Sequence, residues 1–155
     1  MLLPKLNFPE YRFKLQRQSD GLQSLKIFDI IRKKYVTLTP EEWVRQHLLH
    51  FLVNERNFPQ SLISVEKKLY INGLEKRTDV VVYDRSLKPF LLAECKAPEV
   101  AITQEVFDQA ARYNLSLNVS VFLITNGINT FVCRADAGGR SYEFLQEIPP
   151  ATESF

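Results

Sequence analysis

The sequence predicts a single mixed α/β domain in which helices flank a central mixed β-sheet. Two observations carry this prediction. The first is the length of 155 residues, which suits one domain. The second is the order of hydrophobic patterns, which reads helix, three strands, helix, two strands. We therefore expect one domain over 1–155, with an N-terminal extension over 1–24 and a loose tail over 149–155.

The first predicted elements are a strand or short hairpin over 25–38 and a helix that runs to about Glu55. β-branched and aromatic residues favour the strand. At the start of the helix, Thr39 can cap, Pro40 fits the first turn, and Glu42 completes a capping box. The apolar stripe of this helix consists of Val44, Leu48, Phe51 and Leu52.

The pattern changes to alternation after Ser61, which indicates strands. The alternating residues are Ile63, Val65, Leu69 and Ile71. Asn72-Gly73 is a strong hairpin signal. The remaining predicted elements are, in order, strands over 76–84 and 89–96, a helix over 103–117, and strands over 120–125 and 130–134. The predicted inward residues of the second helix are Phe107, Ala110, Ala111 and Tyr113.

Composition indicates a cytoplasmic protein with no membrane association. Cys95 and Cys133 lie in apolar runs without metal-binding spacing, so we expect buried thiols in a reducing compartment. The N-terminus lacks the pattern of a secretion signal, and no apolar stretch approaches the ~18 residues of a membrane span. Net charge is only +2, and the basic excess over 1–34 is explained by phosphate binding or, more commonly, by a solvated face.

Three charged residues form the candidate site: Asp79, Glu94 and Lys96. Glu94 and Lys96 point to the same side of the strand over 89–96, and Asp79 lies on the preceding strand. Two neighbouring carboxylates repel each other, and a divalent cation such as Mg²⁺ with its hard oxygen ligands removes that problem. A lysine there can position a water molecule or stabilise charge on a phosphate. The alternative is ordinary ion pairing, Glu94 with Lys96 or Asp79 with Arg77.

Five segments in the expected order resemble the PD…(D/E)xK nuclease superfamily, and within it the N-terminal nuclease domain of the restriction subunit of type I restriction enzymes. The segments are TPEEWVRQ (39–46), KRTDVVVYD (76–84), LLAECKAP (91–98), FDQAARYN (107–114) and FLITNG (122–127). The similarity covers about 28–133 and implies a restriction-endonuclease-like core. Thr78 stands where the nominal motif has proline, which is a common relaxation of the pattern.

The resemblance implies a metal site and a catalytic lysine. Asp79 and Glu94 correspond to the metal ligands, and the backbone carbonyl of Cys95 to a further ligand. Lys96 corresponds to the catalytic lysine. The implied cation is Mg²⁺, for which Mn²⁺ can substitute.

Helical residues take further roles by the same resemblance. The helical glutamate that completes the metal site, often through water, corresponds to Glu42, with Glu41 as the competitor and plain capping as the alternative role. Gln109 and Tyr113 match a QxxxY element, whose spacing places both on one helix face within reach of the site or the DNA backbone. Core packing is the alternative for both. Arg45 either lines the same pocket or is solvated.

The implied function is Mg²⁺-dependent, endonuclease-like hydrolysis of DNA. The implied partners are DNA and the motor, specificity or methylation subunits of a restriction system, and a homodimer is an open possibility. The chain contains no G-x-x-x-x-G-K-[ST] phosphate loop and is too short for a motor, so we expect a stand-alone relative or a fragment. The alternatives are an inactive nuclease-fold module that binds nucleic acid or a partner protein, and a structural domain with ordinary salt bridges.

Overall fold

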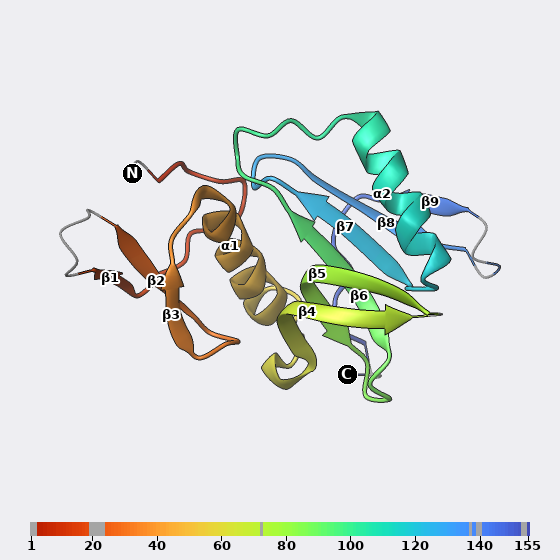
Figure 1. Cartoon of the computed structure of the whole chain (residues 1–155), viewed down its shortest axis with the longest axis horizontal. Coiled ribbons are helices and arrows are strands. Elements are labelled where there is room, and N and C mark those ends of the chain that lie inside the picture. The colour runs from red at the N-terminus through yellow and green to blue at the C-terminus, as the bar shows by residue number, and fades with distance from the viewer. Residues whose placement is uncertain (1–2, 19–23, 72, 137, 139–140, 153–154) are drawn as a thin grey trace.

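The computed structural model describes residues 3–18, 24–71, 73–136, 138, 141–152 and 155. In this described part the protein has two α-helices, a six-stranded mixed sheet and a small three-stranded antiparallel sheet (Figure 1). The elements are β1 (Leu15–Arg17), β2 (Leu25–Asp29), β3 (Lys34–Thr37), α1 (Pro40–Asn54), the 3₁₀ turn η1 (Gln60–Leu62), β4 (Ile63–Ile71), β5 (Leu74–Tyr83), β6 (Pro89–Cys95), α2 (Gln104–Ser116), β7 (Val121–Thr125), β8 (Thr130–Ala135) and β9 (Tyr142–Leu145). The predicted mixed α/β class is confirmed.

The small sheet has the order β1-β2-β3 and lies on the side of α1 away from the large sheet (Figure 1). The sequence predicts a strand or a short hairpin over 25–38, and the structure has the hairpin β2–β3, in which Asp29 pairs with Lys34. β1 and β9 were not predicted from the sequence. Both strands are short, and all three residues of β1 are exposed, so no hydrophobic alternation marks it.

The large sheet has the order β4-β5-β6-β7-β8-β9. Only β6 and β7 are parallel, and α2 makes the crossover between them, as a parallel connection requires. All predicted strands of this sheet are present. Of the predicted Asn72-Gly73 turn, Asn72 lies outside the described residues, and Gly73 has the positive φ of +77° that hairpin turns favour.

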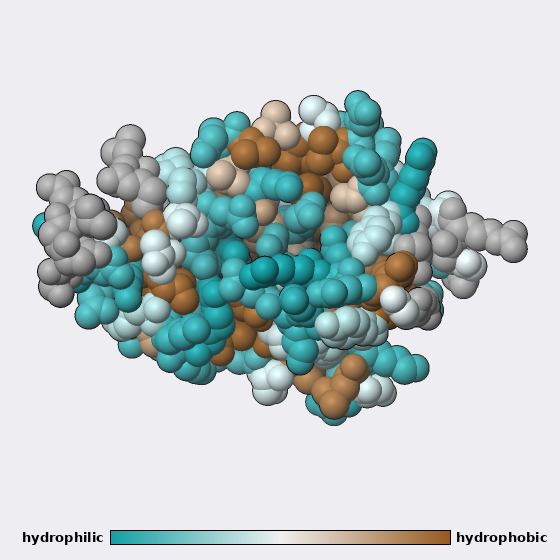
Figure 2. All heavy atoms as spheres, viewed as in Figure 1, coloured by the Kyte–Doolittle hydropathy of each residue, from teal (hydrophilic) through white to brown (hydrophobic). Residues whose placement is uncertain are grey.

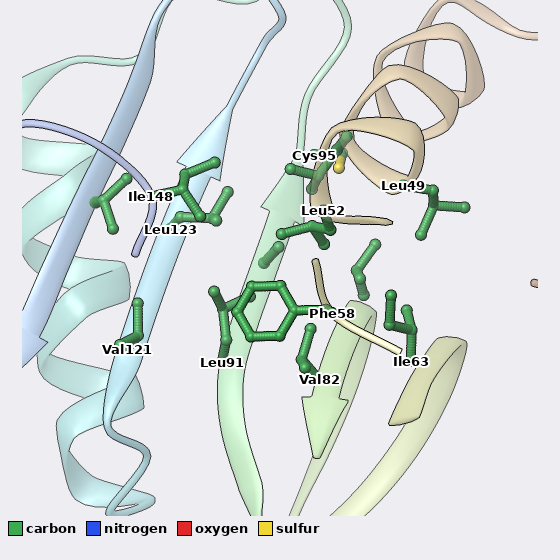
Figure 3. Close-up of a cluster of buried hydrophobic side chains, with 14 of the residues drawn as sticks. Leu49, Leu52, Phe58, Ile63, Val82, Leu91, Cys95, Val121, Leu123 and Ile148 are labelled. Carbon is green, nitrogen blue, oxygen red and sulfur yellow. The ribbon is translucent and has the colours of Figure 1, made fainter. Parts of the chain in front are cut away.

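The two helices cover opposite faces of the large sheet. Along β5, Val80 and Val82 pack in the cluster that contains α1, whereas Val81 packs in the cluster that contains α2. In the α1 cluster, side chains from α1 and from the five strands β4 to β8 converge with Phe58 and Ile148, and Figure 3 shows part of this cluster. The sheet therefore lies between the helices, and α1 separates it from the small sheet.

The C-terminal residues 149–155 were expected to be loose, but those that the structure describes contact the body of the domain. The Ala151 backbone N–H donates to the carbonyl of Arg56 at 2.8 Å. The ring of Phe155 is 9% exposed and lies 5.1 Å from the ring of Phe58 and 4.9 Å from that of Phe90. Burial of a large aromatic ring offsets the cost of ordering the chain end.

The exposure of Tyr113, the state of the two cysteines and the length of the helices can also be compared with the sequence predictions. Tyr113, expected to face inward, is 37% exposed, because it lies at the rim of the α2 cluster beside β5. Cys95 and Cys133 are both buried free thiols, as predicted. None of the described helices is long and apolar enough to cross a bilayer.

Candidate active site

The candidate site lies where β5 and β6 separate. β5 pairs with β6 only back to Val80, whereas its pairing with β4 continues to the hairpin. Asp79 is the residue of β5 just before the separation. Its Oδ2 accepts a 2.7 Å hydrogen bond from the backbone N–H of Cys95. A side-chain carboxylate thus satisfies a backbone donor at this fork and ties Asp79 to the end of β6.

Glu94 and Lys96 lie on the β6 side of the fork, and both are half-buried. The backbone N–H of Lys96 donates to the carbonyl of Thr125 at 2.8 Å, so the chain stays against β7 as β6 ends. Across the described residues, neither the Glu94 carboxylate nor the Lys96 ammonium forms an ion pair or a side-chain hydrogen bond. The ordinary ion pairs considered above, Glu94 with Lys96 and Asp79 with Arg77, are therefore not found in the described chain.

Glu42 is held in buried ion pairs. Its backbone N–H donates to the Thr39 side chain at 3.0 Å, which confirms the predicted cap. Its carboxylate does not complete the capping box, because Oε1 lies 2.7 Å from Nη2 of Arg32 and Oε2 lies 3.2 Å from Nε of Arg45. The residue is 6% exposed. Its two oxygens are thus occupied by the guanidinium groups of Arg32, from the β2–β3 hairpin, and of Arg45, from α1 itself.

Glu41, the neighbouring glutamate of α1, is partly exposed. Burial raises the pKa of its carboxyl above the usual value, and the negative charge of Asp79 adds to this increase, whereas Arg45 and Lys96 act in the opposite direction. The carboxylate is thus electrostatically coupled to two residues of the candidate site. Its ion-pair contact, with Nη2 of Arg45, is 3.8 Å long, and 47% of its side chain is exposed. Of the two helical glutamates, Glu41 is the one whose carboxylate is not held in short, buried ion pairs.

A buried charge network supports the start of α1. Asp29 is 0% exposed, and its Oδ2 accepts 2.7 Å and 2.9 Å hydrogen bonds from Nε of Arg32 and Nε2 of Gln46. Burial alone would raise the pKa of Asp29, but hydrogen bonds from the Arg32 backbone, Gln46 and the Arg32 side chain outweigh burial and lower it. Gln46 is fully buried in this network. The network links the small sheet to α1.

Glu66 closes the network from β4. Its carboxylate lies 3.3 Å from Nη1 of Arg32 and 3.4 Å from Nη1 of Arg45. Its backbone has φ of +53°, a left-handed conformation that is uncommon for a non-glycine residue. It is also the one residue between the first and last pairs of β4 that has no partner in β5: Val65 pairs with Val80 and Lys67 with Thr78. Because Val65 pairs with Val80 and Lys67 with Thr78, Glu66 lies at the position opposite Asp79.

Sequence reasoning missed Asp29, Arg32 and Glu66. These residues are far apart in the chain and match no motif, so no local pattern identifies them. Arg45 was considered as a lining or solvated residue, but it is 5% exposed and its guanidinium lies among three acidic side chains. Only the docking of the small sheet and β4 against α1 brings these charges together.

Gln109 and Tyr113 lie on α2, which covers the other face of the sheet. Gln109 is exposed and lines a shallow surface hollow with Asp108 and Arg112. The Tyr113 hydroxyl donates to the carbonyl of Glu75 at 3.3 Å. Nζ of Lys76 lies 4.9 Å above the centre of the Tyr113 ring. Tyr113 therefore binds the hairpin part of β5.

The donor atoms at the fork suit a hard cation. Among the described residues, no three His, Cys, Asp or Glu side chains are grouped closely enough to hold a metal ion. Mg²⁺ commonly binds through only one or two carboxylates with water. Asp79 and Glu94, with backbone carbonyls nearby, are such a donor set. The thiol of Cys95 is no ligand candidate, because burial and the nearby charge of Asp79 raise its pKa well above the usual value.

Comparison with known proteins identifies one family. Residues 40–149 match the family model described as "Type I restriction enzyme R protein N terminus (HSDR_N)". No curated protein matches the sequence. Among solved structures, the chain is similar to "The fragment structure of a putative HsdR subunit of a type I restriction enzyme from Vibrio vulnificus YJ016", with 19% identity and a TM-score of 0.48. The alignment covers 73% of this chain and 24% of that chain, so this chain spans about a quarter of that length.

Proposed function

Because the chain belongs to the family of type I restriction enzyme R protein N-terminal domains, we propose that it is a Mg²⁺-dependent nuclease domain that hydrolyses phosphodiester bonds in DNA. We also propose that its α/β core is of the restriction-endonuclease type. The observation that carries the proposal is the state of Glu94 and Lys96. Among the described residues, the other buried charges are paired. The half-buried carboxylate of Glu94 and ammonium of Lys96 have no partner there, and both residues lie beside Asp79.

The residues divide into holding and positioning roles. Asp79, Glu94 and the Cys95 carbonyl would hold Mg²⁺, with Glu41 rather than Glu42 as the supporting carboxylate from α1. When bound, Mg²⁺ would neutralise the carboxylates and act as a Lewis acid on the phosphodiester. Mn²⁺ would substitute, since it takes the same oxygen ligands.

The Lys96 ammonium would donate hydrogen bonds to a non-bridging phosphate oxygen or to the attacking water. Its missing ion pair matters here, because an ammonium already neutralised by a carboxylate stabilises developing negative charge less. Gln109 and Tyr113 would not contact the reacting phosphate. Tyr113 would instead hold the β4–β5 hairpin through its hydrogen bond to the Glu75 carbonyl. Partners would be DNA and the motor, specificity or methylation subunits of a restriction system.

Plasmid and linear DNA incubated with Mg²⁺ or Mn²⁺ test the proposal. The native chain should cut, and Asp79→Ala and Lys96→Ala should each cut at least 100-fold more slowly. Lys88→Ala, which removes another lysine charge from an exposed position, is the matched control and should cut normally. Cleavage that survives both site substitutions refutes the assignment.

Metal binding gives a second readout that does not depend on turnover. By calorimetry with Mg²⁺, Asp79→Ala should abolish binding, whereas Lys96→Ala should retain it because it removes a positive charge and no ligand. An inactive module that binds nucleic acid is the second candidate, and it is favoured by the lack of a three-carboxylate cluster in the described chain. DNA binding without metal binding or cleavage would identify it.

A further inference from the structure

The hairpin of β4 and β5 extends beyond the fork as a two-stranded ribbon. We define the β4–β5 ribbon as residues 67–71 and 74–78, the part of the hairpin that lies past Glu66 and Asp79. In this part β5 pairs with β4 on one side, and none of the described strands pairs with its other side. The ribbon therefore begins at the candidate site itself.

One face of the ribbon packs against α2. Leu69 is 7% exposed in the α2 cluster, and Ile71 packs against the same cluster. Tyr113 of α2 donates to the carbonyl of Glu75, and Lys76 lies over the Tyr113 ring. These contacts hold the ribbon to the body of the domain, so its other face is presented at a defined position.

The opposite face of the ribbon is exposed, and two positively charged side chains lie opposite each other on it. Lys68 and Arg77 are direct cross-strand partners, and both are exposed. Two positive charges placed opposite each other destabilise a strand pair. Glu75 lies 3.2 Å from Nζ of Lys68, but both side chains are more than half exposed, so this pair contributes little. In the described chain Arg77 has no acidic partner.

An aromatic residue lies on the same face. Tyr70 is paired with Glu75, next to the Lys68–Arg77 pair, and it is 73% exposed. No ring of another described residue contacts it. Exposed aromatic rings beside cationic side chains are the usual elements of nucleic-acid surfaces, because rings stack on bases and cations contact phosphates. Figure 2 shows hydrophilic residues across the centre of this side of the molecule, over α1, β4 and β5 of Figure 1.

We propose that the exposed face of the β4–β5 ribbon, formed by Lys68, Tyr70 and Arg77, binds the sugar–phosphate backbone of DNA and leads it to the fork. This inference deepens the proposed nuclease function and rests on it for the direction of the DNA. Arg77 precedes Asp79 by two residues, which is about 7 Å along a strand. A phosphate bound by Lys68 and Arg77 therefore lies next to the candidate site. A polyanion on this face also relieves the repulsion between the two cations.

Binding of a fluorescein-labelled 20-base-pair duplex, measured by anisotropy in EDTA across a series of salt concentrations, tests the inference without cleavage. The double variant Lys68→Gln/Arg77→Gln should lose two phosphate contacts. Its slope of log K against log salt should then fall by about 1.8, which corresponds to about 60-fold weaker binding at 0.1 M salt. The matched control Lys88→Gln/Arg134→Gln removes the same charge from exposed positions and should bind within 2-fold of the native chain.

Several outcomes would overturn the inference: no DNA binding by the native chain, equal weakening in both double variants, or native-like binding by the ribbon variant. Displacement of the duplex by polyglutamate at equal charge concentration would overturn the nucleic-acid assignment. The melting temperature of the ribbon variant should not fall, since the substitution removes a like-charge pair. DNA binding through the ribbon without cleavage refutes the nuclease function alone, and cleavage with native-like binding by the ribbon variant refutes this inference alone.

Discussion

Replacing each of the two neighbouring glutamates of α1 should separate stability from site chemistry. Glu42→Gln removes the closest acid from Arg45 at 3.2 Å and one acid from Arg32 at 2.7 Å, while Arg32 keeps Asp29. Breaking a buried ion pair by removing one partner costs about 3–5 kcal/mol, because the other charge is left buried. Since Arg32 keeps Asp29 at 2.7 Å and both arginines keep Glu66, we expect the lower figure, about 3 kcal/mol. In a domain of this size that lowers Tm by about 6–12 °C.

Glu41→Gln should behave in the opposite way. Nearly half of the Glu41 side chain is exposed, and its contact with Arg45 is 3.8 Å long, so the change in unfolding free energy should stay within about 0.5 kcal/mol. It should, however, weaken Mg²⁺ binding in calorimetry, since this is the helical carboxylate coupled to Asp79. Urea unfolding and calorimetry on both variants give the comparison. An unchanged Tm for Glu42→Gln, or normal metal binding by Glu41→Gln with lost binding in Glu42→Gln, would refute the reasoning.

Two further perturbations address pH dependence and chain docking. Burial lowers the pKa of His47 below its usual value despite the Trp43 carbonyl, and burial lowers that of the adjacent His50 despite the charge of Asp29. Both imidazoles therefore contribute stability that is fully present above about pH 6.5 and is lost as the pH falls below that value. The urea midpoint should drop from pH 7 to pH 5.5, less steeply in His47→Phe and least in His47→Phe/His50→Phe; equal slopes would contradict this assignment. Gly127→Ala should destabilise the fold by about 2–3 kcal/mol, because φ is +84° and a Cβ would lie 2.8 Å from Leu6. The control Gly73→Ala has φ of +77° but open space around its Cβ, so it should cost only about 1 kcal/mol, and equal losses in urea unfolding would exclude a role for Leu6.

Local rules predicted most of the elements from the sequence. The cap at Thr39, the alternation from Ile63 and the buried run before Glu94 depend on neighbouring residues, so they can be recognised without knowing the fold. The resemblance then placed Asp79, Glu94 and Lys96 together, and the structure brings the strands of these residues to one fork. β1 escaped prediction because a strand without buried residues has no hydrophobic pattern.

The tertiary structure alone showed that Glu42 is held in buried ion pairs and that Glu41 is not. The resemblance pointed to Glu42, with Glu41 as the competitor. Adjacent helical residues point about 100° apart, so the rotation of α1 on the sheet sets which partners each of them meets. Glu42 pairs with Arg45 within α1, whereas its pair with Arg32 exists only because the small sheet docks against the helix. The ribbon is also a tertiary property, because it exists only where β6 leaves β5. The sequence by itself determined the elements and the residue types of the candidate site, and long-range packing determined which charges are paired and which face the fork.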